Sequence, residues 1–310
     1  MQIEDPLIVL APPRSFTSLF CGVLGQHPEL YGMPELNLFQ AESMRDFWLG
    51  PSRAPQMTQT LWRLWGRQGV LRAVAQLYAG EQTIDGIELA ERWGRVRIAR
   101  TTAEVYRELC AKVSPRRLVD KSPIYTSRQP YLDRILRAFP QARFIHFLRH
   151  PRSQCESFMR IPEFGILAFH QNAIDRSGAV PVLDPQVLWH DAHVRILRML
   201  CLVPRDRWIR VRGEEFMADP DRVLAGICDW LGISASEPAL ERMRHPEDSP
   251  YACMGPPNAP RGNDPNFLKA PKLRPHVSKH LSLEGPVDWR PDGRGFHRRV
   301  VQLARQFGYH

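Results

Sequence analysis

The sequence has no apolar run that approaches the roughly 18 residues needed to cross a membrane. Its first ten residues, MQIEDPLIVL, carry acids where a secretory signal needs a basic region. Their apolar run is also too short for the core of such a signal. We therefore expect no membrane span and place the protein in the cytoplasm.

Cysteine is sparse and scattered. No two of the six cysteines form a C-x-x-C pair, which argues against both a zinc ribbon and a disulfide framework. We expect reduced and mostly buried thiols. The six are Cys21, Cys110, Cys155, Cys201, Cys228 and Cys253.

Lysine is also scarce, so the formal charge of +9 comes almost wholly from arginine. Such a balance favours anionic ligands. A nucleic acid is one candidate, but the basic residues are spread along the chain and no zinc-finger or RNP signature accompanies them. A nucleotide or a phosphorylated cofactor fits the charge equally well.

Strands and helices alternate along the chain. Apolar runs at 7–11 and 142–148 predict buried strands, with shorter ones at 117–119 and 208–211. Helical periodicity follows or precedes each of them, at 17–26, 101–113, 131–139, 188–202, 220–231 and 296–307. This alternation predicts an α/β fold with a central, mostly parallel sheet flanked by helices.

No repeat or linker divides the 310 residues, so we predict one domain. Apolar and aromatic residues recur at helical spacing over 41–79, interrupted by Pro51 and Pro55, which predicts a helical cap at about 40–80. Two stretches, about 160–185 and 246–285, read as irregular substrate-side loops. The aromatic residues between Phe39 and Trp65 fit core packing better than a cage, although they could also line an apolar pocket.

Three predicted strands each end at a cation. The first runs into Arg14, followed by hydroxyl residues at the start of a helix, where free N–H groups and the helix dipole favour an anion. The predicted strand at 117–119 is followed by Lys121 in VDKSP. The one at 142–148 is followed by Arg149, with Ser157 on the next helix. Carboxyl ends of parallel strands meet at one edge of a sheet, so these cations should converge. The first loop lacks the glycines and the lysine of a Walker A motif, which disfavours a standard ATP or GTP hydrolase.

These segments resemble the sulfotransferases that use 3′-phosphoadenosine 5′-phosphosulfate. APPRSFTSLFCGVLGQHPEL is similar to their 5′-phosphosulfate loop, and FIHFLRHPRSQCESF to their 3′-phosphate motif. LVDKSPIY, VRGEEFMADPDRVLAGICDWLGI and RGNDPNF resemble later family motifs, in family order over nearly the whole chain. The resemblance is greatest to a bacterial branch that includes domains of polyketide assembly lines and, more distantly, to tyrosylprotein enzymes. It implies a P-loop-like, three-layer fold and a role in secondary metabolism.

The resemblance also implies residue roles. Arg14, with Pro13, Ser15, Phe16, Thr17 and Ser18, would hold the 5′-phosphate and sulfate. Arg149, Ser157, Arg261 and Gly262 would hold the 3′-phosphate. Lys121 would stabilise the departing bridging oxygen, and Glu35 matches the glutamate that serves as general base in that bacterial branch. Pro123 stands where the phenol and steroid enzymes have a histidine, so the base is not expected at that position. No metal is expected.

Two positions depart from the family pattern. Phe16 replaces a loop glycine, which we expect to be tolerated through a negative φ and a ring turned away from the phosphates. Gly213 replaces a tyrosine, which puts one contact near the adenosine or the substrate in doubt.

Histidines give weaker signals. His190 and His193 have the i, i+3 spacing of metal ligands but no third ligand nearby, and His146 fits a satisfied core residue. His150, beside Arg149, is a further nucleotide-contact candidate.

The expected acceptor is a hydroxyl of a small molecule, a lipid or a carrier-tethered chain. A nucleotide-dependent phosphotransferase of the same broad fold and a basic nucleic-acid-binding protein remain the alternatives. The sequence does not predict an oligomeric state.

Overall fold

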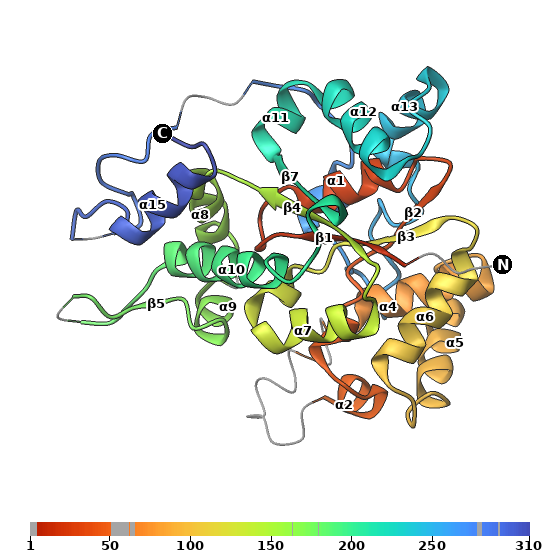
Figure 1. Cartoon of the computed structure of the whole chain (residues 1–310). Coiled ribbons are helices and arrows are strands. Elements are labelled where there is room, and N and C mark those ends of the chain that lie inside the picture. Colours follow the sequence, from red (N-terminus) through yellow and green to blue (C-terminus); the bar gives the residue numbers. More distant parts are fainter. Residues whose placement is uncertain are drawn as a thin grey trace.

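A parallel five-stranded sheet runs through the centre of the molecule, in the order β2-β3-β1-β4-β7 (Figure 1). Its strands are β1 (Leu7–Leu10), β2 (Leu30–Gly32), β3 (Arg117–Asp120), β4 (Arg143–Leu148) and β7 (Trp208–Arg212). The computed structural model describes residues 5–50, 62, 66–162, 164–178, 180–277, 281–290 and 292–310. The predicted α/β fold with a mostly parallel central sheet is confirmed.

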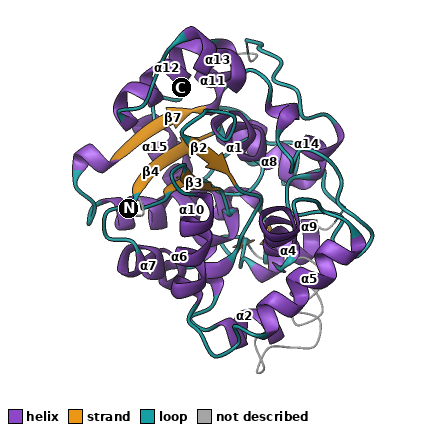
Figure 2. Cartoon of the chain, turned by 90° about the vertical axis from the view of Figure 1, so that its right-hand side faces the viewer, coloured by secondary structure: helices purple, strands orange, loops and turns teal. Residues whose placement is uncertain are grey.

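Helices cover both faces of the sheet (Figure 2). One layer contains α1 (Thr17–Leu24), α11 (Gly213–Ala218), α12 (Pro220–Leu231) and α13 (Glu237–Met243). The opposite layer contains α6 (Thr102–Val113), α7 (Gln129–Ala138) and α10 (Pro185–Leu200). Among the described residues, the other α-helices are α2 (Met44–Leu49), α4 (Gln68–Val74), α5 (Ile84–Arg95), α8 (Pro151–Met159), α9 (Phe164–His170), α14 (Pro265–Lys269) and α15 (Arg298–Gln306).

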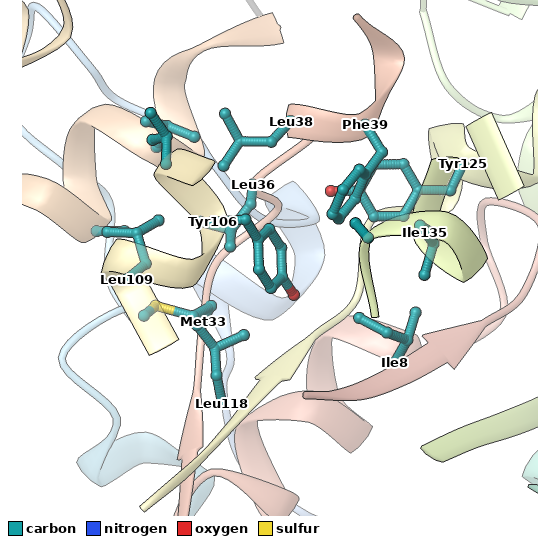
Figure 3. Packing of buried hydrophobic residues seen from close by; sticks show 14 of the residues in the cluster. Ile8, Met33, Leu36, Leu38, Phe39, Tyr106, Leu109, Leu118, Tyr125 and Ile135 are labelled. Carbon is teal, nitrogen blue, oxygen red and sulfur yellow. The ribbon is translucent and has the colours of Figure 1, made fainter. Parts of the chain in front are cut away.

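Alternate residues of the central strand enter two separate hydrophobic cores. Leu7 and Val9 of β1 pack in the cluster beneath α1 and α12, whereas Ile8 and Leu10 pack beneath α6 and α7. Figure 3 shows the second core, in which Ile8 and Tyr106 lie among side chains from the sheet and the helices. All four β1 residues are fully buried because the strand has two covered faces. The continuous apolar run in the sequence therefore reflects burial on both sides.

Aromatic residues of the predicted cap belong to this core. Phe39, Phe47 and Trp48 are buried, and the indole N–H of Trp62 donates to the Phe47 carbonyl at 2.7 Å. Of the two predicted functions of the aromatic residues, core packing and lining an apolar pocket, core packing is confirmed for Phe39, Phe47 and Trp48. Residues 51–61 and 63–65, also part of the predicted cap, lie outside the described residues.

Several elements escape the sequence prediction. The strand β2 has three residues, and α5 and α13 fall in segments to which no element was assigned. The stretch 160–185, expected to be irregular, contains α9 and a hairpin of β5 (Ile174–Asp175) and β6 (Val182–Leu183). The late loop contains α14, which begins at Pro265 with an Asp264 side-chain cap. The prediction that these two stretches are irregular was wrong at these elements, because elements of two to seven residues leave too little periodicity to detect.

Two histidines, one on β4 and one on α10, form a buried pair. His146 and His193 are fully buried, and their ring nitrogens Nε2 and Nδ1 lie 2.9 Å apart. Burial, His193 and Arg210 hold the pKa of His146 well below its usual range, and burial, Arg210 and His190 lower the pKa of His193 to about 3. The prediction of a satisfied core role for His146 is confirmed.

This pair should make the fold sensitive to acid. Below pH ~6.5 the unfolded chain protonates both rings, whereas the folded chain keeps them neutral, so stability falls as the pH falls. Each ring should remove about 2 kcal/mol between pH 7 and pH 5. Asp120, whose pKa burial raises to about 6, acts in the opposite direction.

Urea unfolding of wild type and His193→Gln at pH 7 and pH 5 separates these contributions, because Asp120 is common to both proteins. The variant should lose about 2 kcal/mol less than the wild type over this interval. An identical loss in both proteins would contradict the assignment to His193.

Candidate active site

A cavity of about 590 Å³ opens where β1, β3 and β4 end. Its wall is polar on the side of the loop after β1 and apolar towards α8 and α9. Of the residues predicted for the site, those lining it are Pro13, Arg14, Ser15, Phe16, Thr17, Ser18, Glu35, Arg149, Ser157, Arg261 and Gly262. One predicted residue, Lys121, lies behind this wall.

The loop after β1 has an unusual backbone. Arg14 and Phe16 both adopt left-handed conformations, with φ of 68° and 60°. The prediction of a negative φ at Phe16 was therefore wrong. Helix α1 begins directly afterwards. Its first N–H groups have no acceptor within the helix, and the Phe16 side chain caps none of them. Free N–H groups at a helix N-terminus, preceded by an arginine, form a site for an anion.

Lys121 is almost completely buried, with 1% of its side chain exposed. Its ammonium group donates to Glu35 Oε1 at 2.5 Å, to Ser18 Oγ at 2.7 Å and to Asn263 Oδ1 at 3.4 Å. Glu35 is held by its backbone N–H, which donates to the Gly262 carbonyl at 2.7 Å. The proposed base and the buried cation therefore form one ion pair on the cavity wall.

Ser18 stands between Lys121 and the cavity. Its hydroxyl oxygen accepts from Lys121 Nζ and, at 3.1 Å, from the Asp264 backbone N–H. With both of its acceptor positions used, the hydroxyl can only donate its own proton elsewhere. Because Ser18 lines the cavity, that donor is available to an anion there.

A buried carboxylate supports the end of β3. Asp120 accepts from the hydroxyls of Ser122 (2.8 Å), Tyr125 (3.0 Å) and Tyr106 (3.2 Å). Burial raises its pKa to about 6, against these hydrogen bonds and the charge of Lys121. Ser122 Oγ also accepts from the Asn37 backbone N–H at 3.0 Å. The network thereby fixes the segment of Glu35 against the strand that carries Lys121.

Arg149 and Arg14 lie side by side at the end of β4. Arg149 Nη1 donates to the Arg14 carbonyl at 2.6 Å, and Arg149 Nε donates to Ser153 Oγ at 3.1 Å. Burial, with a smaller contribution from the nearby Arg14 charge, lowers the pKa of Arg149 to about 10, against the pull of Glu214. Arg14 Nε donates to Ser157 Oγ at 3.3 Å, and its Nη1 forms an ion pair with Asp264.

The late loop closes one side of the cavity. Arg72, fully buried, donates to the Arg261 carbonyl at 2.8 Å and to Gln82 Oε1 at 2.5 Å. Gly262 has a φ of 101°, and a β-carbon there would lie 3.0 Å from the Gly69 backbone. Only glycine combines that conformation with so close an approach. Gly213, by contrast, packs against the end of β4, where a β-carbon would lie 3.0 Å from the Leu148 carbonyl.

Sequence reasoning missed several residues of this site. Asp264 and Asn263 contact Arg14 and Lys121 from more than 140 positions away, a pairing that no local pattern reveals. Asn37 and Ser122 belong to the support described above. For the late loop, the glycine-containing stretch RGNDPNF was the one sequence feature that indicated a part in the site.

One group of side chains away from the cavity has the composition of a cation site. Ligand atoms of Asp175, Asp184 and His297 lie within 4.8 Å of one another. The guanidinium of Arg290 already pairs with both carboxylates, so a protein cation balances their charge. His190 and His193 belong to no such group among the described residues.

Comparison with known proteins gives a consistent result. A family model described as "Sulfotransferase family" matches residues 6–237. The sulfotransferase domain of the olefin synthase from Synechococcus PCC 7002 is 27% identical, with a TM-score of 0.72 over 99% of this chain and 95% of that one. The sulfotransferase domain from the curacin biosynthetic pathway is 21% identical, with a TM-score of 0.74 over 100% and 99% of the two chains, and shows the same fold. No curated protein sequence matches the chain.

Proposed function

The chain belongs to the sulfotransferase family, and on this premise we propose that it transfers the sulfuryl group of 3′-phosphoadenosine 5′-phosphosulfate to a hydroxyl group. The observation that supports this most directly is the convergence of Arg14, Arg149 and Glu35 around one cavity with Lys121 beneath its wall. They come from the ends of three neighbouring parallel strands and the segment after β2.

The donor fits the residues present. Its 5′-phosphate and sulfate would lie at the N-terminus of α1, where the free amides, Thr17 and Ser18 offer donors. Arg149, Ser157 and the backbone of Arg261 and Gly262 would hold the 3′-phosphate, which distinguishes this donor from ATP. Arg14, whose Nε donates to Ser157, would lie between the two groups.

The chain's own residues then have two tasks in the reaction. Bound donor supplies an electrophilic sulfuryl group with bisphosphoadenosine as the leaving group. Ser18, polarised by Lys121, donates towards the negative charge that develops on the leaving oxygen. Glu35 accepts the proton of the attacking hydroxyl. No covalent enzyme intermediate is required, by analogy with phosphoryl transfer.

The acceptor would bind against the apolar wall. Ile124, Phe158, Ile161 and Leu167 line the cavity on that side, so the acceptor hydroxyl would be carried by an apolar group. A small molecule, a lipid or a carrier-tethered chain satisfies this condition. The likeness to a domain of the olefin synthase supports a role in bacterial secondary metabolism. The six free cysteines suit a cytoplasmic enzyme, and no helix in the described residues could span a membrane.

Thermal unfolding with nucleotides tests the donor. We expect 3′,5′-bisphosphoadenosine at 100 times its dissociation constant to stabilise the protein by about 2.7 kcal/mol, and ATP to have little effect. Arg149→Gln should remove this stabilisation. Arg205→Gln, at a surface arginine that stacks on Trp208, should retain it.

The alternatives predict other results. Stabilisation by ATP with Mg²⁺ but not by the bisphosphate would indicate a phosphotransferase. Stabilisation by oligonucleotides alone would indicate a nucleic-acid-binding protein. No response to the bisphosphate would refute the proposed donor.

A further inference from the structure

We propose that Phe16 is a positioning residue that holds the Arg149 guanidinium in place for the anionic donor. The inference rests on the proposed donor site and goes beyond it, because Phe16 stands where the family pattern has a glycine. The proposal assigns a function to the phenylalanine side chain at this position.

The backbone at Phe16 gives no reason to prefer a large side chain. Its φ of 60° and ψ of 10° lie in the left-handed region, which glycine adopts without steric cost and residues with a β-carbon do not. Its position as the residue before α1 brings no compensation, since its side chain makes no capping hydrogen bond. A benefit from the ring must therefore offset this strain.

The ring supplies a surface for Arg149. The Arg149 guanidinium carbon lies 3.8 Å from the centroid of the Phe16 ring, in the range of a cation–π contact. Together with the bonds from Nη1 to the Arg14 carbonyl and from Nε to Ser153, this contact fixes the guanidinium from three directions. Its Nη2 donates to no group in the part of the chain that the structure describes, and Arg149 lines the cavity. One edge of the guanidinium therefore remains for a ligand.

The charges nearby explain why such support is needed. Arg14 adjoins Arg149, and burial together with this like charge disfavours the protonated form of Arg149. Glu214, Glu156 and Asp264 offset part of this repulsion between the two guanidinium groups. The negative face of an aromatic ring opposes that repulsion without using any hydrogen-bond donor of the arginine. A carboxylate in the same place would consume the donors and repel the phosphate.

The ring itself has a firm base. Phe16 is half-buried and packs against the hydrophobic cluster beneath α1 and α12. The ring therefore holds the Arg149 side chain in place before the donor binds. Little conformational entropy of that side chain is then lost on binding.

Three substitutions separate this function from a merely structural one. Phe16→Gly relieves the strain and removes the ring, Phe16→Leu keeps the strain and removes the ring, and Phe16→Tyr keeps both. The dissociation constant of 3′,5′-bisphosphoadenosine is measured by calorimetry, and stability by urea unfolding of the same preparations.

We expect Phe16→Gly and Phe16→Leu to weaken binding by about 3–30-fold, which corresponds to the usual strength of a cation–π contact. Phe16→Tyr should bind within about twofold of wild type. In Phe16→Gly the relief of left-handed strain offsets only part of the lost ring packing, whereas Phe16→Leu keeps an apolar side chain in contact with the cluster, so both variants should lose affinity although their stabilities differ. A residue with only a packing role would lose stability without this loss of affinity.

The outcomes distinguish the two proposals. Absence of bisphosphate binding in the wild type would refute the proposed donor and the inference with it. Normal binding by the wild type and equally tight binding by Phe16→Leu or Phe16→Gly would overturn the inference alone, and the proposed function would stand.

Discussion

Replacing Glu35 by glutamine should lower the rate of sulfuryl transfer by roughly 10²–10⁴-fold, the usual contribution of a general base. Glutamine has the same shape and can still accept from Lys121 through its carbonyl oxygen, but it cannot take a proton from the acceptor hydroxyl. Binding of 3′,5′-bisphosphoadenosine should change little, because the leaving nucleotide has no need of the carboxylate. The loss should therefore appear in turnover and not in donor affinity.

The measurement follows release of bisphosphoadenosine from the donor, with whichever compound of a panel of phenols, sterols and 3-hydroxyacyl esters the wild type accepts. Glu42→Gln is the matched control, since Glu42 pairs with Arg134 and Arg137 away from the cavity. It should retain wild-type turnover. If Glu35→Gln also turned over at nearly the wild-type rate, Glu35 would not be the base.

Because Glu35 forms an ion pair with Lys121, the turnover measurement requires one further control. Glu35→Gln leaves a nearly fully buried ammonium group without its carboxylate, which itself destabilises the fold. Turnover is therefore compared well below the unfolding temperature of both proteins. A double-mutant cycle with Lys121→Met separates the pair's contribution to folding from its contribution to transfer.

Replacing Arg290 by methionine should destabilise the protein by about 3–5 kcal/mol, the cost of leaving a buried charge without its partner. Arg290 is 5% exposed and pairs with Asp175 and, at 2.8 Å, with Asp184. Burial alone would raise the pKa of Asp175, yet the bonds from Arg290 and Ser177 hold it well below its usual range. Without the guanidinium, two buried carboxylates would face each other.

Urea unfolding at pH 7 measures this effect. Arg294→Met, at a neighbouring arginine whose side chain is 55% exposed, should cost less than about 1 kcal/mol. Adding Asp175→Asn and Asp184→Asn to Arg290→Met should recover much of the loss, because no buried charge remains. Equal stability of Arg290→Met and wild type would show that the carboxylates find another counter-charge.

The sequence predicted the framework of the site because that framework is local. The runs that became β1 and β4 end in prolines and arginines, and parallel strands place such ends together. Two features could not be predicted. The left-handed φ of Phe16 contradicts the preference of its residue type, and Arg149, which its ring contacts, lies far along the chain. The burial of Lys121 behind Ser18 likewise depends on a late loop whose position no pattern encodes.

The strand order has a consequence for how this protein folds. The central strand pairs Leu7 with Arg143 and with Val119, so its neighbours arrive only after long stretches of chain have been closed. Such non-local pairing slows folding, since the entropy of loop closure precedes the contacts that reward it. The ends of β1, β3 and β4 cannot meet before these pairs exist. Recovery of nucleotide binding during refolding should therefore report the completion of the whole sheet, and no early intermediate should bind the donor.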